Sequence, residues 1–291
     1  MAPLAPSWLL AAVRQAKTDC GSTQARETSS LLASLNLPTV CDSARCPNRG
    51  ECFSQRTATF MILGDTCTRG CAFCAVRHGQ PQPPAEDEPD RLAQAVSELG
   101  LRHVVITSVT RDDLADGGAE HYARVTRVLR SHCAGVKVEL LVPDFKGSAE
   151  SLAEVLSARP DILAHNIETV PRLYPQVRRD ADYRMSLDLL RRSKAISAGT
   201  VTKSGVMLGL GEQADEVAAV LRDLRDAGCD MLTLGQYLSP SMHHAAVVRY
   251  VTPEEFARWR QDALALGFKS VASGPLVRSS YKAPAFFEEL R

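Results

Sequence analysis

Short apolar runs and amphipathic helical patterns alternate along most of this 291-residue chain. Apolar runs rich in β-branched residues predict strands, and they cover 59–63, 103–107, 136–142, 162–167, 202–208 and 231–234. Between the runs, helical stretches place apolar residues on one face, as Leu92, Val96 and Leu99 do before Gly100. The pattern therefore predicts about six strand–helix units.

Local residues indicate where some of these helices begin and end. A helical pattern occupies 217–224. Farther along, Thr252 and Glu255 can exchange capping hydrogen bonds while Pro253 occupies the first helical position. Gly267 is expected to end that last helix.

A strand followed by a helix, repeated, is most simply formed by parallel strands with right-handed helical crossovers. The order predicts a full or partial α/β barrel, in which reacting groups lie at the C-terminal ends of the strands. Residues 80–90 contain four prolines and four acidic residues and are expected to form an exposed connector.

Composition narrows the possible functions. Lys and Arg (34) balance Asp and Glu (34), which favours neither nucleic acid nor an anionic membrane surface as a partner. The apolar stretch 8–13 is too short for a signal peptide. We therefore expect a cytoplasmic protein, where a reducing environment favours metal binding over disulfides for its nine cysteines. Of these, Cys20, Cys133 and Cys229 are isolated and are expected to be ordinary thiols.

The other six cysteines form two triplets, Cys41, Cys46 and Cys52, then Cys67, Cys71 and Cys74. The second triplet begins just after the first predicted strand, and three thiolates without a local fourth ligand suit an iron–sulfur cluster that keeps one iron open. A zinc site usually completes four ligands locally. A non-catalytic protein, either a carrier of two clusters or a zinc-stabilised module, is the competing interpretation.

Several motifs carry a resemblance to known enzymes. The segment 67–76, CTRGCAFCAV, resembles the cluster loop of radical S-adenosylmethionine (SAM) enzymes, including the aromatic Phe73. Six further segments resemble the lipoyl synthase family: CDSARCPNRGEC at 41–52, TSVTRDDLADGG at 107–118, HNIETVPRLY at 165–174, KSGVMLGLGE at 203–212, TLGQYLSPS at 233–241 and SGPLVRSSY at 273–281. The resemblance extends over about 37–282.

The resemblance implies both a fold and a reaction. The fold is an α/β partial TIM-type (β/α)6 barrel at 55–267, with an N-terminal extension, 1–54, and a closing C-terminal segment, 268–291, that together hold an auxiliary cluster. The second triplet would bind a 4Fe-4S cluster whose open iron chelates SAM, and an electron from it would yield methionine and a 5'-deoxyadenosyl radical.

The resemblance also assigns the first triplet. Cys41, Cys46 and Cys52 would hold an auxiliary 4Fe-4S cluster whose fourth ligand is Ser280, with Ser279 as the alternative. This cluster would be consumed as two sulfur atoms are inserted at C6 and C8 of an octanoyl chain on a carrier-protein lysine, one SAM per carbon. The alternative is another radical SAM enzyme, biotin-forming or thiomethylating.

Candidate cofactor contacts come from these segments and, for Arg178, from just after one of them. They are Phe73, Thr107, Ser108, Asn166, Glu168, Arg178, Gly209 and Gly211. Some have a simpler interpretation: strand-end packing for Thr107 and Ser108, solvation of a helix start for Arg178, and backbone flexibility alone for the glycines. His243 and His244 could be taken for a metal-binding pair, but adjacent residues point to different sides. They are therefore expected to be loop histidines.

The implied partners are also specific. The carrier would be an octanoylated lipoyl domain of a 2-oxoacid dehydrogenase complex or the H protein of glycine cleavage. An electron donor such as flavodoxin or ferredoxin and an iron–sulfur carrier for cluster rebuilding are expected, and a monomer is expected. The composition predicts no nucleic acid and no membrane partner.

Overall fold

The structure is a computed structural model that describes residues 3–290. The chain divides into two compact units, each described by itself. The N-terminal unit comprises Val13–Arg69 and Ala75–Leu163, and the C-terminal unit comprises Met1–Ala12, Gly70–Cys74 and Ala164–Arg291. Residues 1, 2 and 291 of the expected terminal segments lie outside the described residues.

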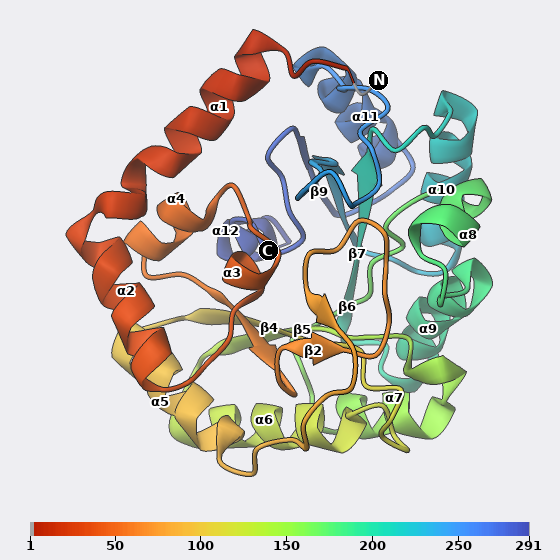
Figure 1. Ribbon diagram of the computed structural model, residues 1–291. Coiled ribbons are helices and arrows are strands. Elements are labelled where there is room, and N and C mark those ends of the chain that lie inside the picture. The colour runs from red at the N-terminus through yellow and green to blue at the C-terminus, as the bar shows by residue number, and fades with distance from the viewer. Residues whose placement is uncertain (1–2, 291) are drawn as a thin grey trace. The chain divides into compact units, whose positions relative to one another are not determined.

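The helices and strands follow one another along the chain as labelled in Figure 1. The first half contains α1 (Ser7–Lys17), η1 (Thr18–Gly21), α2 (Thr23–Ser34), α3 (Val40–Ser43), α4 (Arg49–Ser54), β1 (Thr59–Ile62), β2 (Thr66–Cys67), β3 (Arg77–His78), α5 (Glu88–Leu99), β4 (His103–Ser108), α6 (Ala119–His132) and β5 (Lys137–Leu141). The second half contains η2 (Phe145–Gly147), α7 (Ala149–Ser157), β6 (Ile162–Ala164), η3 (Pro171–Leu173), α8 (Tyr174–Val177), α9 (Tyr183–Ile196), β7 (Val201–Leu208), α10 (Ala214–Asp226), β8 (Met231–Gln236), α11 (Pro253–Ala265), β9 (Ser270–Gly274) and α12 (Ala283–Glu288).

The N-terminal unit is built on parallel strands in the order β1-β4-β5, with β6 next. The register places Thr59 beside Val105 and His103 beside Lys137. Figure 1 shows α5, α6 and α7 along one side of these strands. The strand side chains are buried because branched apolar residues run almost continuously through β4, as expected for a parallel strand covered on its faces.

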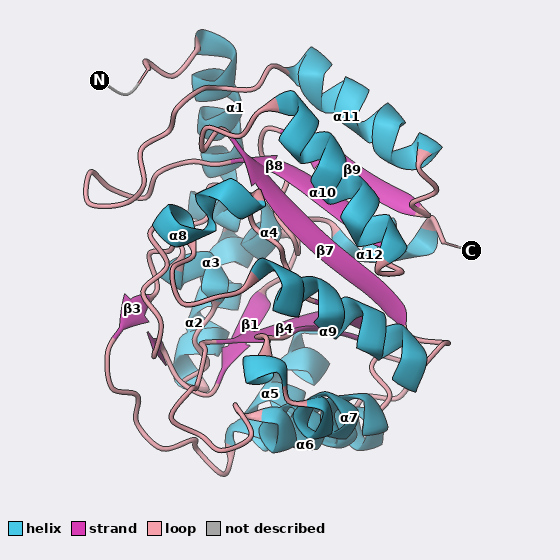
Figure 2. Cartoon of the chain, turned by 90° about the vertical axis from the view of Figure 1, so that its right-hand side faces the viewer, coloured by secondary structure: helices cyan, strands magenta, loops and turns pink. Residues whose placement is uncertain are grey.

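The C-terminal unit has the same construction, with parallel strands in the order β7-β8-β9. The segment that follows β6 continues beside β7, since His165 N–H donates to Lys203 O at 3.0 Å. Figure 2 shows α9 and α10 on the face of these strands turned to the viewer. The apolar stripe of α10, which includes Val220, Leu221 and Leu224, is buried in the core of this unit.

The α/β class with parallel strands and the six predicted strands are confirmed, with ends that differ by a few residues. One strand of the parallel sheet, β9, was missed because Ser270–Gly274 contains small residues and a single branched apolar residue, Val271. The short pair β2 and β3 was also missed. Helix ends are confirmed where glycine or a capping box marks them: Gly100 has φ 66° after α5, and Thr252 forms the capping box of α11.

The exposed connector predicted for 80–90 is wrong at its C-terminal end. Glu88 and Pro89 lie in the first turn of α5 and are buried. The Glu88 carboxylate accepts hydrogen bonds from Leu63 N at 2.9 Å and from His121 Nε2 at 2.7 Å, so its polar atoms are satisfied although it is buried. Across residues 3–290, none of the helices combines the length and apolar character needed to cross a membrane.

Candidate functional site

Cys67, the first cysteine of the second triplet, lies in the N-terminal unit at the end of β2. Its Sγ accepts hydrogen bonds from the backbone N–H groups of Arg69 at 3.4 Å and Thr110 at 3.3 Å. Hydrogen bonds to the sulfur atoms are one of the features that set the reduction potential of an iron–sulfur cluster. The surroundings of this thiol therefore fit a cluster ligand.

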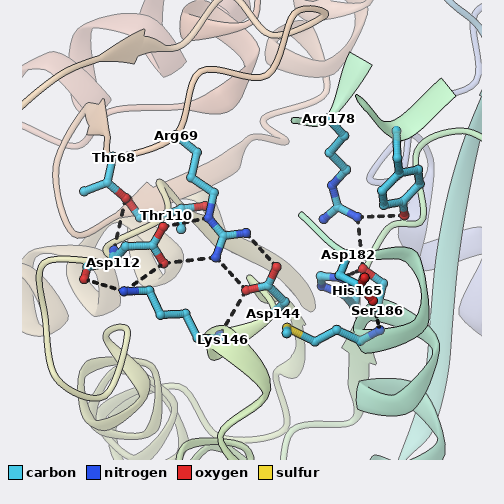
Figure 3. Close-up of polar contacts among 12 residues, drawn as sticks. Thr68, Arg69, Thr110, Asp112, Asp144, Lys146, His165, Arg178, Asp182 and Ser186 are labelled. Atoms are coloured by element: carbon cyan, nitrogen blue, oxygen red, sulfur yellow. Dashed lines mark hydrogen bonds and ion pairs between the residues drawn. The ribbon is translucent and has the colours of Figure 1, made fainter. Parts of the chain in front are cut away.

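Side chains around Cys67 join the cysteine loop to the ends of β4 and β5 (Figure 3). The Arg69 guanidinium makes two hydrogen bonds with Asp112, at 2.7 and 3.0 Å, and two with Asp144, at 2.6 and 2.7 Å. Burial acts to lower the pKa of Arg69, but the hydrogen bonds with Asp144 and Asp112 outweigh it and raise that pKa. The guanidinium therefore remains charged within the loop.

Cys71 and Cys74 belong to the C-terminal unit, where the loop between them is held mainly through its backbone. Ala72 N–H donates to Val177 O at 2.9 Å, and Ala72 O accepts from Ala245 N–H at 2.7 Å. His244 Nε2 donates to Cys74 O at 3.2 Å. His244 is thus a loop histidine, as predicted, but its contact with the cysteine loop was missed because the two residues are 170 positions apart.

The aromatic Phe73 packs against the apolar core of the C-terminal unit. This core contains residues of α9, α10, β7 and β8, including Leu208 and Leu234. Phe73 therefore stabilises the loop between Cys71 and Cys74, and its contact with a cofactor stays a prediction.

Three of the predicted cofactor contacts lie together in the C-terminal unit, after β6. Asn166 Nδ2 donates to Glu168 Oε1 at 3.0 Å, while Asn166 Oδ1 is buried and has no hydrogen-bond partner among the described residues. Glu168 has φ 70°, in the left-handed region that non-glycine residues rarely adopt. Burial raises the pKa of the Glu168 carboxyl, and Arg178 and Asn166 offset this only in part.

Arg178 lies between the pair Asn166 and Glu168 and the cysteine loop. Its Nη1 donates to Tyr174 Oη and Ser186 Oγ, both at 3.1 Å. Figure 3 shows Arg178 beside Ser186 and His165. Burial acts to lower the pKa of Arg178, but Tyr174 and Glu168 act the other way and leave it raised, with Cys71 contributing in the same direction. The guanidinium therefore lies within electrostatic range of both the buried carboxyl and the Cys71 thiol. A polar ligand with amino, hydroxyl or carboxylate groups fits such a site.

Gly209 and Gly211 follow β7 and have φ 104° and 108°, which favour glycine. A Cβ on Gly209 would lie 2.2 Å from Gln236 Nε2 and 2.6 Å from Arg249 O. Glu212 accepts hydrogen bonds from the N–H of Gly209 at 2.7 Å. Close packing thus accounts for Gly209, and contact of either glycine with a cofactor stays a prediction.

Thr107 and Ser108, at the end of β4, use their hydroxyls inside the N-terminal unit. Thr107 Oγ1 donates to Leu141 O at 3.0 Å, and Ser108 Oγ donates to Val109 O at 2.7 Å. These bonds favour the strand-end packing interpretation for both residues. The following Gly118 has φ 89° and its N–H donates to Asp116 Oδ1, as in a tight turn before α6.

The first triplet lies on two short helices of the N-terminal unit. Cys41 is buried in α3, Cys52 lies in α4, and Cys46 N–H donates to Cys41 O at 3.0 Å. Burial, followed by the proximity of Cys46, raises the pKa of Cys41 to about 11. Ser280, the predicted fourth ligand, belongs to the C-terminal unit, where its carbonyl accepts from Ala283 N–H at 3.3 Å.

Within residues 3–290, no three or more Cys, His, Asp or Glu side chains converge as they would on a single metal ion. The cysteines of a 4Fe-4S cluster each bind a different iron atom, so they need not converge in that way. The donor set of the triplets, three thiols each, has the composition that such clusters require.

Comparison with known proteins identifies the class. Residues 61–224, more than half of the chain, match the family model described as the radical SAM superfamily. Two solved structures share the fold: methylornithine synthase, with TM-score 0.56, 16% identity and coverage of 87% of this chain and 75% of its own, and the hydrogenase maturase HydG, with TM-score 0.58, 14% identity and coverage of 96% and 68%. The chain is a radical SAM enzyme.

Curated relatives narrow the class to one family. Lipoyl synthase of Caldanaerobacter subterraneus subsp. tengcongensis is 55% identical over 278 residues, which is 96% of this chain and 95% of the relative. Lipoyl synthase of Acidithiobacillus ferrooxidans is 57% identical over 261 residues, covering 89% of this chain and 82% of the relative. The chain therefore belongs to the lipoyl synthase family.

Proposed function

We propose that the second triplet and the residues after β6 form the radical-generating site. Cys67, Cys71 and Cys74 would hold a 4Fe-4S cluster, which supplies the electron that cleaves SAM to methionine and a 5'-deoxyadenosyl radical. The observation that carries this assignment is Arg178, whose charge lies near both Glu168 and Cys71. A SAM molecule bound at the cluster would meet that charge and the buried carboxyl together.

The side chains at this site have separate roles in the proposal. Arg178 would orient the SAM carboxylate through charge-assisted hydrogen bonds. Asn166 Oδ1, which has no partner among the described residues, would accept a hydrogen bond from a ligand hydroxyl or amino group. Glu168 would accept from the same groups, and a cationic ligand would offset the cost of burying its charge. The remaining candidates, Phe73, Thr107, Ser108, Gly209 and Gly211, stay proposed SAM contacts; local packing and hydrogen bonds are the competing interpretation for the first four.

We further propose that Cys41, Cys46 and Cys52, with Ser280, hold the sulfur source. Two sulfur atoms would be inserted at C6 and C8 of an octanoyl chain that is amide-linked to a carrier-protein lysine, with one SAM spent at each carbon. Family membership supports this assignment. The proposed segments for the auxiliary site are 1–54 and 268–291, flanking the barrel at 55–267.

The proposed carrier is an octanoylated lipoyl domain or the H protein of glycine cleavage. A flavodoxin or ferredoxin would supply electrons, and an iron–sulfur carrier would rebuild the sulfur source. We also propose a monomer that works in the cytoplasm, where a reducing environment suits a chain with nine cysteines.

The test is a product-mass assay. The reconstituted chain is incubated with SAM, a reductant and a peptide carrying octanoyl-lysine, and the peptide is followed by mass spectrometry. Gain of two sulfur atoms, with loss of two hydrogens once the dithiol closes to a disulfide, is the expected result. SAM cleavage with no sulfur gained by any octanoylated carrier would contradict sulfur insertion and leave the radical SAM class intact.

A further inference from the structure

We propose that Arg69 is a positioning residue that fixes the N–H donors facing Cys67 Sγ and thereby raises the reduction potential of the cluster bound there. The proposal rests on the assignment of Cys67 as a cluster ligand. It adds a role for a side chain between the cysteines of the loop. Every contact that carries it lies within the N-terminal unit.

First, the planar guanidinium of Arg69 anchors the cysteine loop. Arg69 holds Asp112, in the segment after β4, and Asp144, in the segment after β5, through two hydrogen bonds each. The side chains of Arg69 and Asp144 are 9% and 1% exposed, so water screens this ion pair little. Bidentate pairing fixes orientation as well as distance. Arg69 therefore ties the cysteine loop to the ends of two neighbouring strands.

The second step connects this anchor to the sulfur atom. Thr68 N–H and Thr68 Oγ1 both donate to Thr110 O at 3.0 Å, and Asp112 N–H donates back to Thr68 Oγ1 at 3.0 Å. The N–H groups of Arg69 and Thr110, on the two sides of this clamp, both donate to Cys67 Sγ. Movement of Arg69 away from its carboxylates would loosen both donors at once.

The third step separates geometry from charge. Lys146 Nζ donates to Asp112 O at 3.0 Å and lies 4.0 Å from Asp112 Oδ1. Arg69 and Lys146 thus balance Asp112 and Asp144, and the network carries no net charge. Its effect on a cluster at Cys67 would come from the fixed N–H donors and not from a net field. Those donors stabilise the reduced cluster more than the oxidised one, because reduction adds negative charge at the sulfur atoms.

The test compares Arg69→Lys with Arg69→Met. Lysine keeps the positive charge but has no planar fork, so it cannot hold both carboxylates in the same way. In the cluster-free chain, hydrogen exchange at the Thr68 and Thr110 amides is expected to accelerate at least about tenfold in both variants. In the reconstituted chain, the midpoint potential of the cluster, followed by electron paramagnetic resonance during reductive titration, is expected to become more negative.

The matched control is Arg127→Lys. Arg127 pairs with Glu154 at 2.8 Å in the same unit, but its side chain is 53% exposed, so its replacement is expected to change neither reading. Asp144→Asn, which weakens the same fork from the strand side, replaces the Arg69 variants if these do not fold, as judged by circular dichroism. It is expected to accelerate exchange in the same way, and exchange is its reading, because the lost carboxylate charge acts on the potential in the opposite direction.

Three results would overturn the proposal. Wild-type exchange and potential in Arg69→Lys would make charge alone sufficient, and faster exchange with an unchanged potential would make the network merely structural. Unchanged exchange in Arg69→Met or Asp144→Asn would show that Arg69 does not fix the N–H donors. The exchange measurement needs no cluster and no substrate. Failure of the wild-type chain to cleave SAM would therefore count against the proposed function and leave the exchange result to be judged separately.

Discussion

Cys67 and Cys41 come from different triplets but lie in the same unit, and their surroundings differ in chemistry. The Cys67 thiol faces two backbone N–H donors. Burial raises the pKa of the Cys41 thiol, in the four-residue helix α3, to about 11, although hydrogen bonds from Thr59 act to lower it. Beside Cys67, Arg69 and Asp144 are 9% and 1% exposed, whereas beside Cys41 the pair Arg49 and Asp42 is 30% and 50% exposed. Cys67 therefore lies beside a buried ion-pair network, and Cys41 lies beside a half-exposed ion pair.

This difference matches the roles proposed for the two sites. A cluster that generates radicals repeatedly has to survive each turnover, and buried bidentate ion pairs keep its loop in one geometry. A cluster that gives up its sulfur has to be dismantled and rebuilt, and short helices joined by exposed contacts can move at lower cost. The comparison suggests that the stiffness of each cysteine segment follows the fate of the cluster it holds.

The strongest test of the comparison replaces one cysteine from each triplet. Cys67→Ala is expected to lower SAM cleavage at least about a thousandfold, because the cluster that supplies the electron loses a ligand. Cys41→Ala is expected to abolish sulfur insertion while SAM cleavage persists. Cleavage is measured as 5'-deoxyadenosine by liquid chromatography with mass spectrometry, with the exposed Cys20→Ala as the control. Sulfur insertion by Cys41→Ala would remove the proposed division of roles.

A second test concerns the chain just before the second triplet. Leu63 has φ 66°, and a Cβ on Gly118 would lie 2.3 Å from Leu63 Cδ1. Gly118→Ala is therefore expected to lower the free energy of unfolding by about 2–4 kcal/mol. The matched control is Gly135→Ala, which also has positive φ, 80°, but has nothing within 4 Å, and about 1 kcal/mol is expected there. If urea unfolding gives equal losses in free energy of unfolding for Gly118→Ala and Gly135→Ala, Leu63 is not tightly packed against Gly118.

A third and smaller effect is expected from Glu168→Gln. Folding raises the pKa of the Glu168 carboxyl, so ionising it lowers the free energy of unfolding. This loss begins as the pH rises above the pKa of the unfolded state and is complete once the pH exceeds the pKa of the folded state. The variant is therefore expected to gain stability over the wild type at pH 8 and to lose that advantage at low pH. Its affinity for SAM, measured by calorimetry, is expected to fall about tenfold, because a charged acceptor becomes a neutral one. Unchanged affinity would remove Glu168 from the SAM site.

Much of the fold could be predicted from the sequence because the relevant patterns are local. A branched apolar run marks β4, and Thr252 with Glu255 marks the start of α11 within four residues. β9 was missed because its residues carry little apolar pattern. Glu88 was misplaced because its partners, Leu63 and His121, come from other segments.

In the candidate site too, local patterns could be predicted from the sequence and contacts between distant segments could not. The cysteine spacings are local and could be read directly, and Asn166, Glu168 and Arg178 come from one short stretch, 166–178, that the structure brings together. The contacts that hold the cysteine loop could not be read. Arg69 meets Asp112 and Asp144 across 43 and 75 positions, and no periodicity or spacing marks such pairs in a single sequence.

The central claim, that a cluster bound to this chain supplies the inserted sulfur, is tested most directly by isotope labelling. The clusters of the chain are reconstituted with a heavy sulfur isotope, and SAM, reductant and octanoyl-lysine peptide of natural isotopic composition are added for a single turnover. The account predicts a lipoyl product in which both sulfur atoms are heavy. A product that carries light sulfur would contradict it.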